Sequence, residues 1–292
     1  MTSFTGAFTA LITPFRNGAF DEKAYCNLID WQIASGIDGL VPLGTTGESP
    51  CVSYEEHFKI ISACVKHVRG RVPVVAGAGS NATNLAIKLA KQAKEAGADA
   101  TLQVTPYYNK PTQEGLFQHF KAVAEAVDLP HILYNVPGRT SVNMLAETTI
   151  RLSKVKNIVG VKEACGDLTQ IQKVIEGSSH HFIVLSGDDA LNTQVYAAGG
   201  KGTISVASNV APAQVARIWD LYRDGDSKVA LAEQEKLEPL NHVLFIETNP
   251  IPAKTALALM GKCALEFRLP LVPMSEQNLV ILKKTLQQFG LL

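Results

Sequence analysis

Short apolar runs alternate along most of the chain with longer segments of helical periodicity. Runs of this length, rich in β-branched residues and bounded by glycine or proline, predict buried parallel strands. In the segment that follows the fourth run, Phe117, Phe120, Val123 and Val127 share one helical face. The eight predicted strands are Ala7–Pro14, Gly39–Gly44, Val72–Gly79, Ala100–Pro106, His131–Pro137, Ile158–Ala164, Phe182–Gly187 and Gly202–Ala207.

Eight strand–helix units in a row predict an α/β fold, a closed (β/α)8 TIM barrel, whose usual size is about 250 residues. A doubly wound open sheet is the alternative, but it usually has fewer strands and a reversal of strand order. From about Arg223 the strand pattern stops, and Ser227–Leu292 has helical patterns only. We therefore expect a catalytic barrel over residues 1–224 and a small C-terminal helical appendage over residues 225–292.

Lys162 lies inside the otherwise apolar strand Ile158–Ala164. Burial disfavours a charged amine and lowers its pKa, and a neutral amine attacks carbonyl carbon. The alternative is a lysine at a frayed strand end whose ammonium reaches water. Strand alternation puts Ile158, Gly160 and Lys162 on the inner face of the barrel, where Gly160 would leave room.

Tyr134 faces inward near the end of the preceding strand by the same alternation. Neighbouring strands lie about 4.8 Å apart, so Tyr134 could share a small cavity with Lys162 and carry protons there. The alternative is an aromatic core residue whose hydroxyl is hydrogen-bonded. Because chemistry in such barrels lies at the carboxyl ends of strands, this position favours a catalytic role.

Two further strand ends carry candidate anion ligands. The turn Gly44-Thr45-Thr46-Gly47-Glu48 offers exposed amides and hydroxyls to a carboxylate, although such turns often only cap a helix. Glu48 is expected to be structural. Arg139, beyond Tyr134, could bind a second carboxylate through two hydrogen bonds, or it could be a surface arginine.

Two patterns resemble other kinds of site. Gly77–Ala82 imitates a dinucleotide fingerprint, but Asp99 precedes the next strand instead of ending it, which argues against nucleotide binding. Asp188 and Asp189 lack a nearby histidine pair, so we expect helix caps and no metal site. Their charge also disfavours a phosphosugar substrate, because barrels often bind phosphate at this position.

Composition narrows the possible partners. The 27 basic and 27 acidic residues balance, which leaves no basic stripe for nucleic acid or an anionic membrane. No apolar run approaches the roughly 20 residues of a membrane span. The N-terminus, Met1–Phe15, lacks the basic start of a signal peptide. Five cysteines, an odd number without metal-type spacing, fit a reducing cytoplasm.

The motifs Gly44–Glu48, Tyr134–Thr140 and Val161–Ala164 together resemble the pyruvate-dependent class I aldolase family. The resemblance extends through Thr105–Asn109 and Asn249–Pro252, nearly end to end. It implies a Schiff-base lyase without a cofactor or metal, which condenses pyruvate with L-aspartate 4-semialdehyde in lysine and diaminopimelate biosynthesis. It also implies a homotetramer built from two tight dimers.

The same resemblance assigns individual roles. Lys162 would form the imine and Tyr134 would be its acid/base, with Thr45 linking Tyr134 to the Tyr108 of a neighbouring subunit. The carboxylate of pyruvate would bind Thr45 and Thr46, and that of the semialdehyde Arg139. The implied residues are catalytic Lys162, Tyr134, Thr45 and Tyr108, and substrate-binding Thr45, Thr46, Arg139, Gly187 and Ile204, the last through its carbonyl.

Two other functions remain open from the sequence. N-acetylneuraminate lyase, or another sugar-acid aldolase, would use the same lysine and tyrosine to cleave a sugar acid. Arg139 favours the condensation, because a short aldehyde that bears a carboxylate calls for this cation and the lyases lack it. A barrel that binds a keto acid without turnover is the alternative from a different class.

Family members that lysine inhibits bind it in a cleft at the dimer interface. Ser49, His57, Asn81 and Tyr107 match positions of that cleft. Leu85 stands where sensitive members carry glutamate, and Tyr54 where they often carry histidine. Because leucine cannot pair with an ammonium, a contact worth on the order of 1.5–3 kcal/mol is lost, and weak or absent feedback inhibition is expected.

Overall fold

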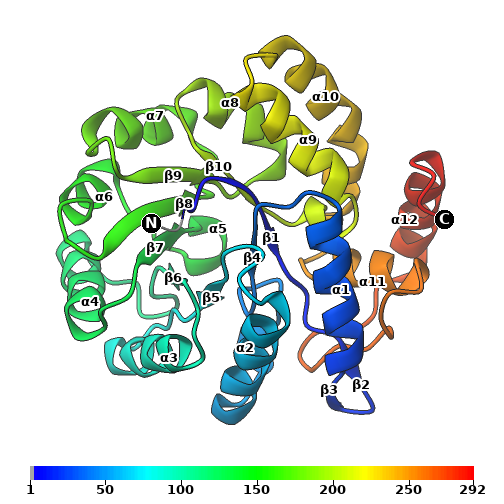
Figure 1. Cartoon of the computed structure of the whole chain (residues 1–292), viewed down its shortest axis with the longest axis horizontal. Coiled ribbons are helices and arrows are strands. Elements are labelled where there is room, and N and C mark those ends of the chain that lie inside the picture. The colour runs from blue at the N-terminus through cyan, green and yellow to red at the C-terminus, as the bar shows by residue number, and fades with distance from the viewer. Residues whose placement is uncertain (1–2) are drawn as a thin grey trace.

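The computed structural model describes residues 3–292, and its centre is a ring of parallel strands surrounded by helices (Figure 1). The strand order β4-β1-β10-β9-β8-β7-β6-β5 is that of a (β/α)8 barrel, as predicted. The barrel strands are β1 (Gly6–Ala10), β4 (Gly39–Val41), β5 (Val75–Gly77), β6 (Ala100–Val104), β7 (His131–Asn135), β8 (Ile158–Glu163), β9 (Ile183–Ser186) and β10 (Gly202–Ser205).

The ring closes between β4 and β5 through a bridge from Leu40 to Val74. Leu40 donates its N–H to the carbonyl of Pro73 (3.0 Å), and Gly77 donates to that of Pro42 (2.9 Å). Both prolines supply a carbonyl but no N–H, because the pyrrolidine ring replaces the donor. This closing contact is consequently short of hydrogen-bond donors.

All eight predicted strands are present, and each is shorter than its apolar run. Several runs end in a proline, as at Pro14, Pro106 and Pro137, where the ladder loses a donor and the chain leaves the sheet. A small hairpin of β2 (Phe15–Arg16) and β3 (Ala19–Phe20) was not predicted, because it is too short for a periodic pattern.

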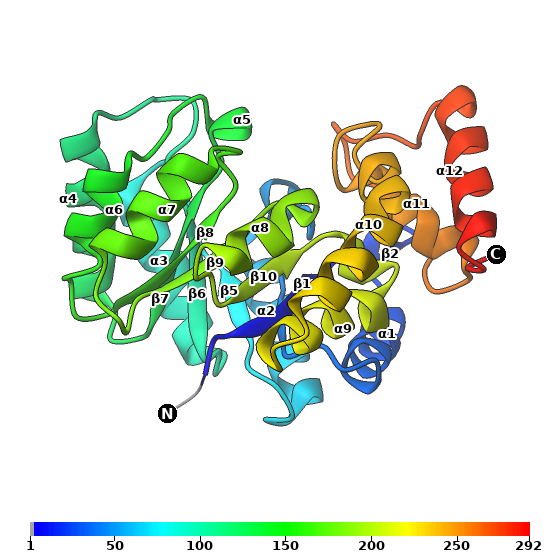
Figure 2. The ribbon, with the colours of Figure 1, turned by 90° about the horizontal axis from the view of Figure 1, so that it is seen from above.

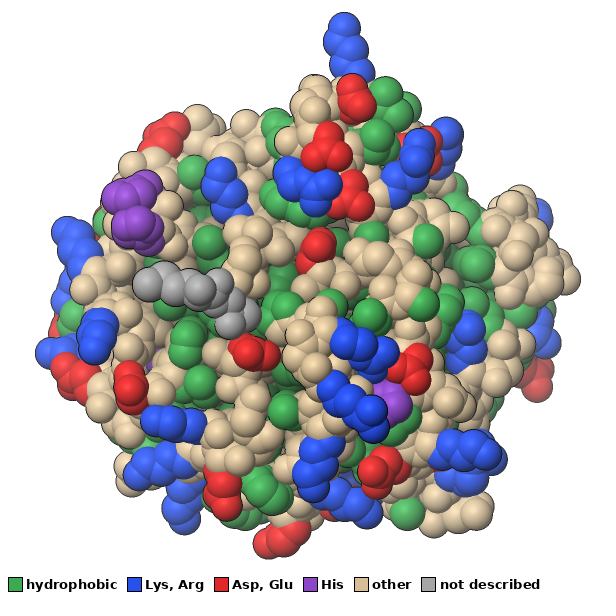
Figure 3. Space-filling model, in the orientation of Figure 1, with side chains coloured by type: hydrophobic (Ala, Val, Ile, Leu, Met, Phe, Trp, Pro, Cys, Tyr) green, Lys and Arg blue, Asp and Glu red, His purple; other side chains and the backbone are tan. Residues whose placement is uncertain are grey.

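Helices cover the outside of the ring (Figure 1). Basic and acidic side chains are both scattered over the face drawn in Figure 3, in keeping with the balanced charge. Within residues 3–292, none of the helices combines the length and the apolar character needed to cross a membrane. The helices are α1 (Glu22–Ala34), α2 (Tyr54–Val68), α3 (Thr83–Glu95), α4 (Gln113–Ala126), α5 (Pro137–Thr140), α6 (Ala146–Leu152), α7 (Leu168–Gly177), α8 (Asn192–Ala197) and α9 (Pro212–Arg223), with short 3-10 helices at Ser49–Cys51 (η1), Asp189–Leu191 (η2) and Ala207–Asn209 (η3).

The C-terminal segment is helical, as predicted, with α10 (Ser227–Val243), α11 (Ile251–Leu259) and α12 (Glu276–Gln288). In Figure 2, α11 and α12 lie on the side of the barrel away from α4 and α6. The sequence places the second of these helices after Pro252, but α11 starts at Ile251, because proline is tolerated in a first turn. The predicted division after residue 224 falls in the turn between α9 and α10.

The alternation predicted for β8 is wrong at its start. His131 pairs with Ile158 but Ile132 pairs with Gly160, so one extra residue of β8 interrupts the register. Ile158 therefore packs among the outer residues beneath the helices instead of facing inward. Gly160 does not leave open space either, since a Cβ atom there would lie 2.3 Å from the side chain of Ile183.

Candidate active site

Lys162 and Tyr134 are direct register partners on β8 and β7. The Lys162 Nζ lies 4.4 Å from the centroid of the Tyr134 ring. Both side chains are buried and line a cavity of about 470 Å³. The structure thus brings together the two residues that sequence reasoning put in one cavity.

Burial is the main cause of the pKa shifts of Lys162 and Tyr134. It lowers the pKa of Lys162 to about 8, while the Asp189 carboxylate raises it and Arg139 lowers it further. Burial raises the pKa of Tyr134 to about 12, with Arg139 acting in the opposite direction. Near neutral pH the site therefore holds a protonated phenol beside an amine that can lose its proton.

Gly187 makes space for the Lys162 side chain. A Cβ atom on Gly187 would lie 2.9 Å from Lys162 Cε and 2.8 Å from the Ala164 Cβ. The Gly187 N–H donates to the carbonyl of Glu163, which ties the end of β9 to β8 (2.6 Å). Ile204, also predicted in the site, is buried in β10 among the side chains that fill the barrel.

The Gly44–Glu48 turn borders the same cavity with Thr45 and Thr46. Hydrogen bonds from Gly47 to Gly44 and from Glu48 to Thr45 (both 3.1 Å) close it. Gly47 is required, because a Cβ atom there would lie 2.9 Å from backbone atoms of Leu43. The hydroxyls of the two threonines are thereby held at the barrel mouth.

Arg139 lies in α5 on the exposed side of the cavity. Its Nη2 donates to the carbonyl of Asn249 (3.0 Å), and the Asn249 Nδ2 donates to Thr46 Oγ1 (2.9 Å). Asn249 therefore joins two predicted anion ligands, one that follows β7 and one that follows β4. The sequence analysis gave Asn249 no individual role, although it belongs to the Asn249–Pro252 motif that extends the family resemblance.

Residues of α10 and its C-terminal turn also line the cavity, and they were not predicted because they follow the last strand by more than 30 residues. They are Glu238, Asn241, His242 and Phe245. Within residues 3–292, no group of three or more His, Cys, Asp or Glu side chains is placed to bind a metal ion.

A second cavity of about 420 Å³ shares Thr45, Tyr134 and Arg139 with the first. Its walls include Ser49, Tyr54, His57, Leu85 and Tyr107, five of the six residues compared above with a regulatory cleft. The sixth, Asn81, is not among its lining residues, and the carbonyl of Asn81 accepts a hydrogen bond from Asn109 Nδ2 (2.8 Å). Burial lowers the pKa of His57.

Tyr108 is the one predicted catalytic residue that the single chain does not bring to the site. Its side chain is 90% exposed, and its φ of +71° places it in the left-handed region. It lines neither of the two cavities described above.

The two acidic residues after β9 differ in role. Asp188 caps the short helix η2, since its Oδ1 accepts from the N–H of Ala190 (3.0 Å), as predicted. Asp189 was also expected to be a cap, and this is wrong. Its Oδ2 accepts from the N–H groups of Val206 (2.9 Å) and Ala207 (2.8 Å), so it holds the end of β10.

A closed parallel barrel with a buried lysine beside an inward-facing tyrosine is typical of aldolases that form a Schiff base with their substrate. The chain belongs to the dihydrodipicolinate synthetase family, whose family model matches residues 3–289.

Individual relatives match over nearly their whole length. The 4-hydroxy-tetrahydrodipicolinate synthase of Oleidesulfovibrio alaskensis is 54% identical over 289 residues, 99% of each chain. The crystal structure of dihydrodipicolinate synthase from Aquifex aeolicus superposes with a TM-score of 0.97 at 47% identity, covering 99% of both chains. The crystal structure of the chloride-inhibited dihydrodipicolinate synthase from Acinetobacter baumannii complexed with pyruvate gives a TM-score of 0.97 at 43% identity, covering 99% of this chain and 100% of the other.

Proposed function

We propose that this protein condenses pyruvate with L-aspartate 4-semialdehyde to form 4-hydroxy-tetrahydrodipicolinate, through an imine on Lys162. The observation that carries the proposal is the direct register pairing of Lys162 with Tyr134 in one cavity, with a lysine pKa of about 8. The full-length similarity to 4-hydroxy-tetrahydrodipicolinate synthases at 54% identity supports the choice of reaction.

The neutral Lys162 amine attacks the keto carbon of pyruvate, and water leaves to give the imine. The protonated imine withdraws electrons from the neighbouring methyl group, which loses a proton and becomes an enamine. The enamine carbon attacks the aldehyde carbon of the second substrate. The amine of that substrate then attacks the imine carbon, displaces Lys162 and closes the ring. Tyr134, protonated at neutral pH, carries the protons of these steps.

Carboxylate binding is assigned to two groups at the mouth. Thr45 and Thr46 bind the carboxylate of pyruvate, because their turn lies beside the cavity that holds Lys162. Arg139 binds the carboxylate of the semialdehyde, since this exposed residue lines the same cavity. Gly187 lines the cavity against the Lys162 side chain, and the carbonyl of Ile204 is assigned a place near the amine on the family resemblance.

The assembly is proposed to be a homotetramer in which Tyr108 of one subunit reaches the site of its neighbour and meets Thr45. The 90% exposure of Tyr108 in the single chain supports this, because such a ring is available to a second copy. We also propose that the protein acts in the cytoplasm, supported by five cysteines that are all free.

Borohydride reduction in the presence of pyruvate tests the chemistry. Reduction of the imine leaves a stable secondary amine, and we expect peptide mass spectrometry to find it on Lys162. Lys162→Ala should give no adduct, and Tyr134→Phe should slow turnover by roughly 100-fold or more. Absence of the adduct in the unmodified protein would refute the proposal.

Activity assays with different second substrates distinguish the remaining candidate functions. Consumption of aspartate semialdehyde together with pyruvate supports the synthase. Release of pyruvate from a sugar acid, without this condensation, would identify an N-acetylneuraminate lyase or a related aldolase. An adduct without turnover of either kind would identify a keto-acid-binding barrel.

A further inference from the structure

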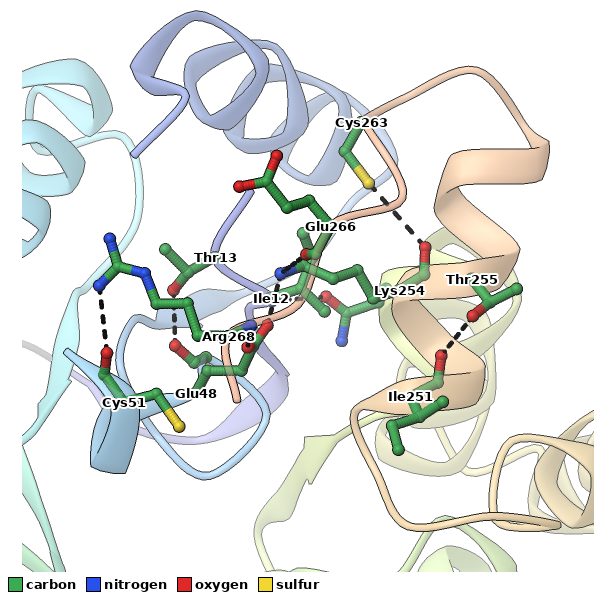
Figure 4. A network of polar contacts seen from close by, with 12 residues as sticks. Ile12, Thr13, Glu48, Cys51, Ile251, Lys254, Thr255, Cys263, Glu266 and Arg268 are labelled. Atoms are coloured by element: carbon green, nitrogen blue, oxygen red, sulfur yellow. Dashed lines mark hydrogen bonds and ion pairs between the residues drawn. The ribbon is translucent and has the colours of Figure 1, made fainter. Parts of the chain in front are cut away.

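A buried ion pair lies behind the Gly44–Glu48 turn (Figure 4). The Glu48 and Lys254 side chains are both 0% exposed. Lys254 Nζ donates to Glu48 Oε1, and the other carboxylate oxygen, Oε2, accepts from the backbone N–H of Arg268 (3.1 Å). Because Glu48 ends the turn and Lys254 belongs to α11, the pair joins the barrel mouth to the C-terminal segment.

The surroundings of Lys254 satisfy its charge further. Its Nζ also donates to the carbonyl of Glu266 (2.8 Å) and lies over the ring of Phe15 (4.4 Å). Burial lowers the pKa of Lys254, and the Glu48 carboxylate acts against that effect. Burying two charges costs about as much as their attraction returns, and a well-packed apolar pair often stabilises a fold equally well. Stability alone therefore does not explain why charges occupy this position.

The position of the pair suggests a different role. Glu48 has a φ of +57°, so its backbone conformation is one that needs support from its side chain or neighbours. Its N–H donates to the carbonyl of Thr45 (3.1 Å), which links the ion pair directly to the substrate-facing residues. On the barrel side, the Thr13 hydroxyl donates to the carbonyl of Gly47 (2.7 Å).

The same C-terminal segment also fixes a side chain of the turn. The Thr46 hydroxyl accepts a hydrogen bond from Asn249 Nδ2 (2.9 Å). A hydroxyl that accepts in this way keeps its own hydrogen for a different partner, and a carboxylate in the adjoining cavity is suited to receive it. Asn249 orients the donor, and the ion pair holds the backbone that bears it.

We propose that Glu48 and Lys254 are positioning residues, which hold the Thr45-Thr46 turn at the distance from Lys162 that a keto-acid carboxylate requires. The inference rests on the proposed function. In an α-keto acid the carboxylate is bonded directly to the carbon that Lys162 attacks, so carboxylate binding and imine formation share one geometry. A misplacement of about 1 Å can cost roughly 100-fold in such a case.

The test uses Lys254→Met, Glu48→Gln and the double variant carrying both changes. Borohydride-trapped adduct on Lys162 is measured by mass spectrometry as the pyruvate concentration is varied. We expect the half-saturating concentration to rise about 10-fold or more, and the trapping rate at saturation to change by less than about threefold. Each single variant leaves one buried charge without its partner, so its melting temperature should fall.

The double variant distinguishes an effect on positioning from an effect on stability. It removes both charges, so neither is left buried without its partner. We expect its melting temperature to recover toward that of the unmodified protein, while its half-saturating pyruvate concentration stays raised. If a single variant does not fold, the double variant decides. Lys262→Met is the matched control, since this lysine belongs to the same segment but packs over Trp31 of α1 (3.7 Å); it should leave pyruvate binding unchanged.

Two results would overturn the inference alone: a double variant that saturates at the pyruvate concentration of the unmodified protein, or a control that shifts as much as the variants. An unmodified protein without any pyruvate adduct would instead overturn the proposed function, and this inference with it.

Discussion

Opposing interactions act on the amine of Lys162. Burial favours the neutral form, whereas the Asp189 carboxylate and the face of the Tyr134 ring, 4.4 Å away, favour the ammonium. Burial prevails, because the resulting pKa of about 8 is below the ordinary value of 10.5. Near neutral pH a fraction of the Lys162 amines is therefore unprotonated and able to attack carbonyl carbon.

This balance predicts the pH dependence of imine formation. Only the neutral amine attacks, so the trapping rate with pyruvate should rise with pH and level off above a midpoint of about 8. Asp189→Asn removes a carboxylate that raises the lysine pKa, and it should move the midpoint to lower pH. Rapid-quench borohydride trapping across the range gives both curves, and a rate that does not vary with pH would contradict the assignment.

Gly187→Ala is predicted to displace the Lys162 side chain without changing its charge. The added methyl group would lie 2.9 Å from Lys162 Cε, so the lysine must leave its position. We expect adduct formation to slow by roughly 10-fold or more, with unchanged secondary structure by circular dichroism. Gly138→Ala is the control, since a Cβ atom there would have no neighbour within 4 Å. Equal rates in the two variants would argue against crowding at Lys162.

The secondary-structure elements explain which parts of this site the sequence could reveal. Lys162 and Tyr134 are found by strand alternation, because both stand near the carboxyl ends of apolar runs. The bulge that turns Ile158 outward has no such signal, since one extra residue changes the face without changing composition. Glu48 was expected to be structural, but its ion-pair partner Lys254 lies 206 positions away, beyond any local pattern.

The start of α2 gives a prediction about stability. Ser53 Oγ accepts from the N–H of Glu56, and Glu56 Oε2 accepts from the N–H of Ser53 (both 3.2 Å), which forms a capping box. Ser53→Ala should lower the free energy of unfolding by about 1 kcal/mol in urea denaturation. Ser227→Ala, in the exposed first turn of α10, should change it by less than about 0.5 kcal/mol. A larger loss at Ser227 than at Ser53 would contradict the capping role.

At the scale of the whole molecule, the two cavities adjoin and share part of their walls. Thr45, Tyr134 and Arg139 border both. Helix α10, the turn after it and Asn249 complete the first cavity, which explains why a site predicted from the barrel strands alone is incomplete. Resemblance supplied the roles of Tyr108 and of the second cavity; neither follows from the pattern of a single chain.

Feedback by lysine is predicted to be weak or absent. Leu85 lines the second cavity and offers no charge to an ammonium, and losing that contact weakens binding by roughly 10- to 150-fold. Steady-state rates should be unaffected by micromolar lysine. Leu85→Glu should introduce inhibition, whereas Leu85→Gln, of similar size but neutral, should not. Inhibition of the unmodified protein at micromolar lysine would overturn the prediction.

The proline-flanked join between β4 and β5 has a consequence for how the molecule opens. A ring of strands separates first where its ladder is thinnest, and here Pro42 and Pro73 accept hydrogen bonds without returning any. Native-state amide exchange should therefore be faster at Leu40 and Gly77 than at Leu133 and Val161, which lie in a continuous ladder. Slower deuterium uptake at Leu40 and Gly77 would place the first opening elsewhere. Such opening would begin next to Gly44–Glu48, the turn proposed to bind the carboxylate of the keto acid.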